Sequence, residues 1–232
     1  MGKTVRNFIQ TNGKLMIIYF TGIDGSGKST LIKELENRKV FGEKYTTTRG
    51  GYVVKLMKPI SNIVRKKKVK SSPNYNYISK SDYNRWKDFK IKLLKSRLIN
   101  SLLYTIQSFD YYLQILKLEK KHLNNSFNST IILDRYIYDF LIAMNIFYGD
   151  KSNSYWYKKL EKKLVLVDYI FFIDTNCKSA FSRKDDIPSL EFLEERRLFY
   201  LKTLKNVEKC YNIDNNGNIE ETINQIEKIL LK

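Results

Sequence analysis

The stretch Gly22-Ile-Asp-Gly-Ser-Gly-Lys-Ser29 follows the apolar run Met16-Ile-Ile-Tyr-Phe20, and a helical pattern of apolar residues follows it. Glycines at this density let the backbone curl so that its N–H groups point at one centre, because no side chain blocks the approach. A helix that starts directly after such a loop adds its unpaired N–H groups and the positive end of its dipole. This order of strand, loop, Lys-Ser pair and helix is typical of a phosphate-binding P-loop, so the segment predicts a nucleoside triphosphate site.

The side chains of this loop have separate expected roles. Lys28 can reach the β- and γ-phosphates of a bound nucleotide, and the Ser29 hydroxyl can ligate Mg²⁺. A glycine-rich turn before an ordinary helix is the alternative, which the matching strand and helix on either side disfavour. The expected nucleotide-binding residues are Gly22, Asp24, Gly25, Ser26, Gly27, Lys28, Ser29 and Thr30.

The composition limits the classes of protein to which the chain can belong. Its 232 residues are enough for one α/β domain with a substantial core, and 43% of them are hydrophobic. No apolar stretch approaches the roughly 20 residues of a membrane helix, and the N-terminus lacks the apolar centre of a signal peptide. We therefore expect a cytoplasmic protein. The 2 cysteines and 1 histidine give no disulfide framework or metal knuckle and argue against histidine-based catalysis.

The formal net charge is +18 at pH 7, and much of it lies in residues 55–97. A basic field attracts polyanions, so nucleic acid is a possible partner. Such a field also suits an enzyme whose substrates are all phosphorylated. The alternative that we favour is a solvated basic face, because net charge bears on solubility and steering rather than on fold.

Short apolar runs alternate with helical patterns along the chain. This alternation is typical of an α/β fold, in which a parallel sheet carries helices on both faces. The predicted strands are residues 16–21, 45–48, 130–133, 168–173 and 208–213.

A long amphipathic helix is predicted over about residues 83–122, with a possible break. Its apolar residues recur every three or four positions, and we expect most of this stripe to lie in the core. The stripe consists of Leu98, Leu102, Ile106, Phe109, Leu113 and Leu116.

Two further helices are predicted near the C-terminus. One begins after Ser189, a residue type that caps helices, with Glu191 in its first turn. The other spans residues 219–230 and follows the turn formed by residues 214–217. The expected buried side of the first consists of Leu190, Leu193, Leu198, Leu201 and Leu204.

A second group of candidate site residues follows the predicted strand 130–133. Asp134 and Arg135 stand where this strand emerges, and in open α/β sheets ligands bind at that carboxyl edge. A carboxylate here can orient Mg²⁺ or its waters, and the arginine can form paired hydrogen bonds with a phosphate. A surface ion pair is the alternative, which a P-loop in the same sheet disfavours.

A third group lies in residues 182–188, Ser-Arg-Lys-Asp-Asp-Ile-Pro, which place Arg183 and Lys184 in a loop late in the chain. Cations in a closing lid can offset charge on the transferring phosphoryl oxygens while closure excludes water. The same pattern also fits an exposed turn, and its position after the fourth predicted strand favours the lid.

The order of these motifs along the chain is that of a known family of kinases. Together, Gly22–Thr30, Arg49 after the second strand, Asp134-Arg135-Tyr136 and the Arg183 lid resemble the thymidylate kinase family of P-loop nucleoside monophosphate kinases. The resemblance implies a three-layer P-loop NTPase fold with a five-stranded parallel sheet in the order 2-3-1-4-5 and a short lid. It also implies ATP as the phosphoryl donor, Mg²⁺ as the metal, a nucleoside monophosphate as the acceptor and, commonly, a homodimer.

The resemblance also implies roles for individual residues. By analogy with the family, Asp24 would contact the acceptor sugar, and Arg49 and Arg135 would hold the acceptor phosphate. Ser29 and Asp134 would place the Mg²⁺ ion.

In some members of the family, an arginine of the P-loop supplies positive charge to the transferring phosphoryl group. Gly25 stands where some relatives carry an arginine. The lid would therefore supply the cation, with Arg183 first and Lys184 second.

The resemblance sets the expected domain organisation as well. Residues 16–232 would form a single kinase domain, with a basic helical insert at about 52–97 and the lid at about 182–188. Family members usually begin at the first strand, so we expect residues 1–15 to be a disordered extension, and Met16 is a possible start.

The chain departs from the family pattern mainly on the acceptor side. Gly50-Gly51-Tyr52-Val53 follows Arg49, where the family has Glu-Pro-Gly-Gly. Thr105-Ile106-Gln107-Ser108 replaces an Ala-Asp-Arg motif, which leaves Gln107 as the candidate substrate contact in that helix. Asp139 stands where a serine is expected. These departures indicate a divergent thymidylate-kinase-like branch.

The sequence therefore predicts ATP- and Mg²⁺-dependent phosphoryl transfer to a nucleoside monophosphate, with dTMP as the best-supported acceptor. The expected catalytic residues are Lys28, Arg183, Asp24 and Arg135. A P-loop kinase acting on another nucleotide, a nucleoside or a small phosphorylated metabolite is the first alternative, because the acceptor motifs are altered. A nucleotide-gated nucleic-acid-binding protein is the second, because of the basic residues at 55–97.

Overall fold

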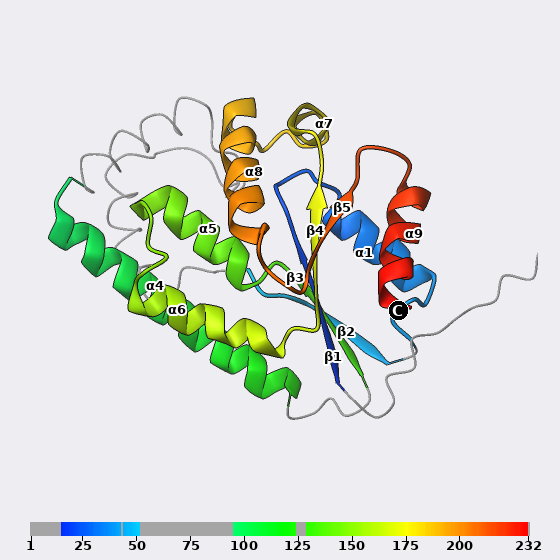
Figure 1. Cartoon of the computed structure of the whole chain (residues 1–232), viewed down its shortest axis with the longest axis horizontal. Helices are drawn as coiled ribbons and strands as arrows, with labels where there is room; N and C mark the ends of the chain where they lie inside the picture. The colour runs from blue at the N-terminus through cyan, green and yellow to red at the C-terminus, as the bar shows by residue number, and fades with distance from the viewer. Residues whose placement is uncertain (1–14, 43, 52–94, 124–128, 232) are drawn as a thin grey trace, which may run out of the picture.

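A sheet with helices on both faces forms the part of the chain that the structure describes (Figure 1). The predicted N-terminal extension, except Leu15, lies outside the described residues. Most of the predicted basic insert and the predicted helix before residue 95 also lie outside them. The computed structural model describes residues 15–42, 44–51, 95–123 and 129–231.

The sheet has five parallel strands in the order β2-β3-β1-β4-β5. The central strand β1 is buried along almost its whole length, as expected for a parallel strand covered on both faces. The predicted α/β fold and strand order are confirmed, and the predicted strand bounds differ from the observed ones by at most two residues. The strands are β1 (Met16–Thr21), β2 (Tyr45–Arg49), β3 (Thr130–Asp134), β4 (Tyr169–Asp174) and β5 (Cys210–Asp214).

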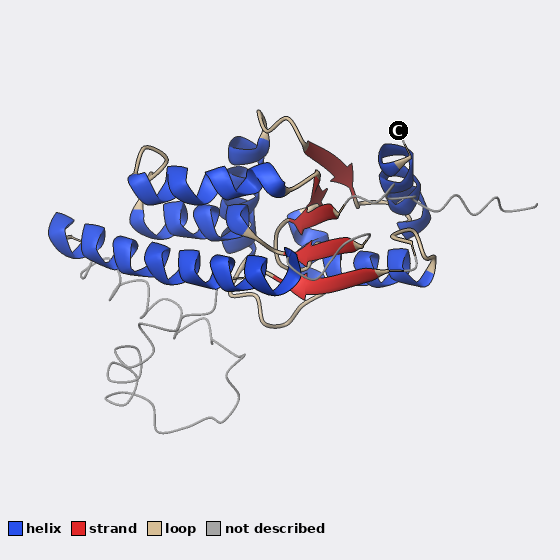
Figure 2. Cartoon of the chain, turned by 90° about the horizontal axis from the view of Figure 1, so that it is seen from below, coloured by secondary structure: helices blue, strands red, loops and turns tan. Residues whose placement is uncertain are grey.

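The sheet divides the apolar core in two, because successive side chains of a strand point to opposite faces. Ile18 and Phe20 of β1 pack on the face covered by α1 (Lys28–Asn37) and α9 (Ile219–Leu230). Ile17 and Tyr19 pack on the other face, which the remaining helices cover (Figure 1, Figure 2). These helices are α4 (Arg97–Leu123), α5 (Ile137–Tyr148), α6 (Tyr155–Glu161) with the 3-10 helix η1 (Lys162–Leu166), α7 (Cys177–Ser182) and α8 (Leu190–Leu204).

Helix α8 begins where the sequence predicts it. The Ser189 hydroxyl accepts a hydrogen bond from the Phe192 backbone N–H at 3.2 Å, which confirms the predicted N-cap. Leu193 and Leu204 are buried as expected, but Leu198 is 65% exposed, so its predicted burial is wrong. Leu198 falls on the solvent side of α8 because the buried positions of this helix are 193, 200 and 204.

The predicted core stripe of α4 is wrong. Of its six residues only Ile106 is half-buried, whereas the others are exposed, with Leu98 at 84% and Leu102 at 60%. Aromatic packing determines which side of α4 faces the core: Tyr111 stacks on Phe140 of α5, with ring centroids 4.2 Å apart. The buried face of α4 consists instead of Tyr104, Ser108, Tyr111 and Ile115, together with Asp110.

Among the described residues, no helix combines the length and the apolar character that crossing a membrane requires. The cytoplasmic location expected from the sequence stays a prediction.

Two leucines of α8 provide a matched test of this packing. Leu193→Ala is expected to lower the free energy of unfolding by about 2–5 kcal/mol, because it leaves a cavity in the core. Leu198→Ala is expected to change it by no more than about 0.5 kcal/mol, because its side chain lies in water. Urea unfolding followed by circular dichroism measures both, and equal losses in the two variants would contradict the orientation of α8.

Candidate active site

The P-loop joins the end of β1 to the start of α1 and is shaped by glycines with positive φ. Gly22, Gly25 and Gly27 have φ angles of 145°, 77° and 84°. A Cβ atom on Gly25 would lie 2.2 Å from the Ala180 carbonyl oxygen of α7. The tight approach of α7 therefore explains why glycine, and not a longer side chain, occupies position 25.

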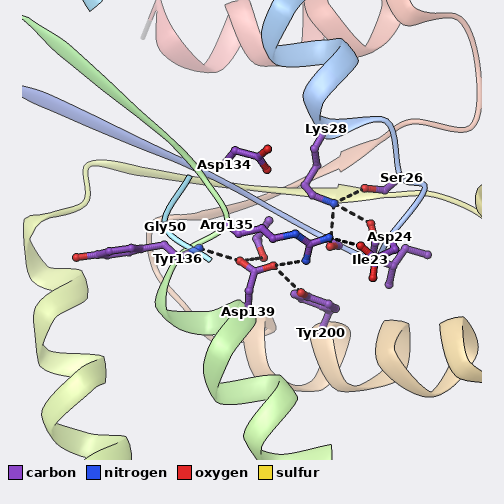
Figure 3. Close-up of polar contacts among 12 residues, drawn as sticks. Ile23, Asp24, Ser26, Lys28, Gly50, Asp134, Arg135, Tyr136, Asp139 and Tyr200 are labelled. Carbon is purple, nitrogen blue, oxygen red and sulfur yellow. Dashed lines mark hydrogen bonds and ion pairs between the residues drawn. The ribbon is translucent and has the colours of Figure 1, made fainter. Parts of the chain in front are cut away.

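Lys28 folds back into the loop (Figure 3). Its Nζ donates to the Gly22 carbonyl oxygen at 2.9 Å, to the Ile23 carbonyl oxygen at 2.7 Å and to the Ser26 hydroxyl at 2.9 Å. Burial, together with the positive charge of Arg135, lowers the pKa of Lys28 to about 7. The lysine thus occupies the centre of the loop, where a phosphate would restore the stability of its charged form.

Two further residues hold the loop in place, and the sequence analysis did not identify them. The Ser26 carbonyl oxygen accepts a hydrogen bond from Asn215 Nδ2 at 2.7 Å and another from Thr175 Oγ1 at 3.2 Å. Asn215 follows β5 and Thr175 follows β4, so the carboxyl ends of both strands support the P-loop. The predicted turn at 214–217 was the only sequence signal at this place.

Ser29 and Asp134, the two predicted metal ligands, lie next to each other. The Ser29 hydroxyl lies 3.3 Å from Asp134 Oδ2, which joins the first turn of α1 to the end of β3. A hydroxyl and a carboxylate suit Mg²⁺, which binds through one or two protein oxygens and takes its other ligands from phosphates and water. These two residues could hold the ion beside the P-loop.

Arg135 follows β3 in a left-handed backbone conformation, with φ at 66°. Its backbone is fixed on both sides: its N–H donates to the Phe20 carbonyl oxygen at 3.0 Å, and its carbonyl oxygen accepts from the Gly50 N–H at 3.1 Å. Its guanidinium forms ion pairs with Asp24 at 2.5 Å and with Asp139 at 3.2 Å. The arginine is thereby aimed at the P-loop (Figure 3).

Asp139 is the site residue whose role the sequence analysis missed. Its carboxylate accepts hydrogen bonds from the Tyr19 hydroxyl at 2.5 Å and from Thr21 Oγ1 at 3.1 Å. It also accepts one from the Tyr200 hydroxyl at 2.6 Å (Figure 3). Burial and then the charge of Asp139 raise the pKa values of Tyr19 and Tyr200, so both hydroxyls stay protonated and donate. The available signal was an acid within an otherwise apolar helical segment, at a position where the family has serine.

The lid arginine also lies at the P-loop. A Cβ atom on Gly27 would be 3.6 Å from Arg183 Nη1. Lys184, the next residue, forms an exposed ion pair with Asp186 at 3.8 Å between Nζ and Oδ1. The predicted lid therefore brings at least one cation to the start of α1.

The two remaining predicted residues lie farther from this centre. Arg49 ends β2 at the same edge of the sheet, in register with Asp134, and its side chain is exposed. Gln107 donates to the Tyr148 hydroxyl at 2.6 Å, which connects α4 to α5. The roles of Arg49 and Gln107 in substrate binding stay predictions.

The lowered pKa of Asp24 shows that the electrostatic potential at the site is positive. Burial alone would raise the pKa of its carboxyl group, but nearby cations outweigh this effect and lower the pKa. In decreasing order of effect, these cations are Arg135, Lys28, Arg196 and Lys184. Cations from the loop, the end of β3, the lid and α8 thus all act on one carboxyl group, and such a positive field is suited to binding phosphates.

Comparison with known proteins agrees with this geometry. No family model matches the chain. A thymidylate kinase of Thermosipho melanesiensis is 28% identical over 229 residues, which cover 93% of this chain and 97% of the relative. The match therefore extends over nearly the whole length of both chains.

Solved structures share the fold. A thymidylate kinase from Candida albicans matches with a TM-score of 0.53 at 15% identity, covering 93% of this chain and 91% of that one. A deoxyadenosine kinase from M. mycoides, solved with bound dATP, matches with a TM-score of 0.53 at 18% identity, covering 94% and 100%. At these identities the likeness shows the fold alone.

The depressed pKa of Lys28 predicts that nucleotide binding takes up a proton. At pH 8 the amine is mostly neutral in the free protein, because its pKa lies at about 7, whereas adjacent phosphates favour the charged form. ATP binding at pH 8 is therefore expected to take up about one proton per site. Isothermal titration calorimetry in buffers of different ionisation enthalpy measures this number.

Two variants serve as controls for this measurement. Lys28→Met is expected to abolish most of the uptake, whereas Lys33→Met, which removes an exposed lysine of the same helix, is expected to retain it. Equal proton uptake by the wild type and Lys28→Met would contradict the assignment to Lys28.

Proposed function

We propose that this chain, which is 28% identical to a thymidylate kinase, transfers the γ-phosphoryl group of ATP to a nucleoside monophosphate, and that this acceptor is dTMP. The observation that carries the proposal is the position of Lys28, Arg135 and Arg183 around one P-loop. Lys28 lies inside the loop, Arg135 pairs with its Asp24, and Arg183 approaches its Gly27. Cations placed on several sides of one loop suit a transferring phosphoryl group.

Each residue has a role in this proposal. Lys28 and the loop N–H groups hold the triphosphate, and Ser29 and Asp134 would hold Mg²⁺, which would supply positive charge to offset that of the phosphates. Arg135 aligns the acceptor, and Arg183 stabilises the charge on the transferring group.

Phosphoryl transfer requires alignment of the two substrates rather than a strong general base. The phosphoryl group passes through a loose transition state whose charge is spread over its oxygens, so positioning and charge neutralisation supply most of the catalysis. The buried ion pairs of Arg135 restrict the orientation of its guanidinium before substrate arrives. Such preorganisation reduces the reorganisation that the reaction requires.

A P-loop kinase with another acceptor is the second candidate. The altered acceptor motifs and the fold shared with a deoxyadenosine kinase support it. The nucleic-acid-binding alternative depends on the basic residues 55–97, most of which lie outside the described part of the chain, and it stays a prediction.

ADP production from ATP and Mg²⁺ tests the proposed function. Turnover is expected with dTMP, and much less with thymidine, the other nucleoside monophosphates or no acceptor. Turnover with thymidine but not with dTMP would replace the proposal with a nucleoside kinase. ATP hydrolysis that nucleic acid stimulates, without any small-molecule acceptor, would favour the nucleic-acid-binding alternative.

Variants assign the roles within this reaction. Lys28→Ala is expected to lower kcat by at least about 10³-fold, and Arg183→Ala by about 10²–10³-fold with a smaller change in KM. Lys202→Ala, which removes an exposed cation of α8, is expected to act like the wild type. An unchanged kcat in Arg183→Ala would exclude the lid arginine from the mechanism.

We also propose that the chain forms a homodimer through the exposed stripe of α4. The resemblance implies a dimer, and this stripe places apolar side chains on one side of the helix, away from its buried face. Its exposed members are Leu98, Leu102, Phe109, Leu113 and Leu116.

Light scattering after size-exclusion chromatography tests this contact. The wild type is expected to have the mass of a dimer and Leu102→Glu that of a monomer, because the new charge would be buried between the copies. Leu198→Glu on α8 is the control and is expected to stay dimeric. A monomeric wild type would contradict the proposed dimer.

A further inference from the structure

Arg196 lies on α8 beside the site, in a position that sequence reasoning did not identify. It stands one helical turn before Tyr200, whose hydroxyl donates to Asp139. Its guanidinium carbon lies 4.3 Å from the centroid of the Phe192 ring. Since the ring of Phe192 supports one face of the guanidinium, the orientation of this group is restricted.

The Arg196 guanidinium has unused hydrogen-bonding capacity. Its Nε is buried and has no hydrogen-bond partner among the described residues. In the same part of the chain, no carboxylate lies within ion-pair distance of Arg196, whereas its neighbour Arg197 forms a paired contact with Asp174 at 2.6 and 2.7 Å. A half-buried arginine without an acid of its own is costly unless an anion reaches it.

The charge of Arg196 acts on the site itself. It lowers the pKa of Asp24, against the raising effect of burial, and it opposes the rise in the pKa of Tyr200 that burial and Asp139 cause. The charge of Arg196 therefore affects both the P-loop carboxyl group and the Tyr200 hydroxyl, which lies one turn farther along α8. Arg135 pairs with both Asp24 at 2.5 Å and Asp139 at 3.2 Å, and neither carboxylate forms an ion pair with Arg196.

The position of Arg196 distinguishes it from the cations of the nucleotide half. Lys28 bonds the loop carbonyls and Arg183 approaches Gly27 at the start of α1, where the ATP phosphates would lie. Arg196 instead lies one turn of α8 before Tyr200, whose hydroxyl donates to Asp139. Asp139 also pairs with Arg135. We propose that Arg196, together with Arg135, binds the phosphate of the acceptor, so that a nucleoside without this phosphate binds much more weakly.

This inference rests on the proposed function and adds a residue that selects the substrate class. The planar guanidinium offers paired N–H donors to two phosphate oxygens, which a lysine ammonium cannot reproduce. A dianionic phosphate between two arginines would also give Arg196 the anionic partner that it lacks among the described residues. The stacked arginine thus favours a monophosphate over a nucleoside.

Direct binding to the full-length chain tests the proposal. Isothermal titration calorimetry with dTMP, thymidine and ATP is applied to the wild type, Arg196→Ala, Arg196→Lys and the control Lys202→Ala. Arg196→Ala is expected to weaken dTMP binding by about 10- to 100-fold and to leave thymidine and ATP affinities unchanged. Arg196→Lys is expected to fall between Arg196→Ala and the wild type, and Lys202→Ala to match the wild type.

The outcomes separate this proposal from the proposed function. Unchanged dTMP affinity in Arg196→Ala, in a wild type that turns dTMP over, would overturn the role of Arg196 alone. Equal losses for dTMP and thymidine would show that the residue supports the fold, and a loss confined to ATP would place it in the nucleotide half; both results overturn the proposal. A wild type that turns over no monophosphate would overturn both the proposed function and this inference.

Discussion

The buried carboxylate of Asp139 is the interaction on which the rest of the site depends. It accepts hydrogen bonds from Tyr19 and Thr21 of β1 and from Tyr200 of α8, and it pairs with Arg135 at the end of β3. These contacts connect the central strand to two helices on the same face of the sheet. A buried charge is tolerable only when its hydrogen-bonding capacity is satisfied, so the same contacts that neutralise Asp139 also fix the neighbouring side chains.

The contact with Asp139 also determines where the Arg135 guanidinium points. With one side of its guanidinium bound to Asp139, the other side reaches Asp24 in the P-loop. The carboxyl ends of the parallel strands thereby bring cations from distant parts of the chain to one edge of the sheet. Lys28 occupies the loop centre, where its Nζ donates to the Gly22 and Ile23 carbonyl oxygens. An anion at this place would relieve the cost of gathering these charges.

The sequence predicts the parts that depend on local spacing, such as the P-loop, the strands and the cap at Ser189. It does not predict contacts between segments far apart in the chain, such as that of Tyr200 with Asp139, because periodicity carries no information about which side chains meet. The stripe on α4 shows the same limit. Its leucine spacing correctly indicates a helical face, but the stacking of Tyr111 on Phe140 turns a different face to the core.

The central claim is that donor and acceptor phosphates meet at one cationic edge of the sheet. Inhibition by a bisubstrate analogue, in which adenosine and thymidine are joined through a polyphosphate chain, tests it most directly. The account predicts that the analogue binds more tightly than either substrate and competes with both ATP and dTMP, because it spans both halves of the site. Competition with ATP alone, at an affinity no better than that of ATP, would contradict it.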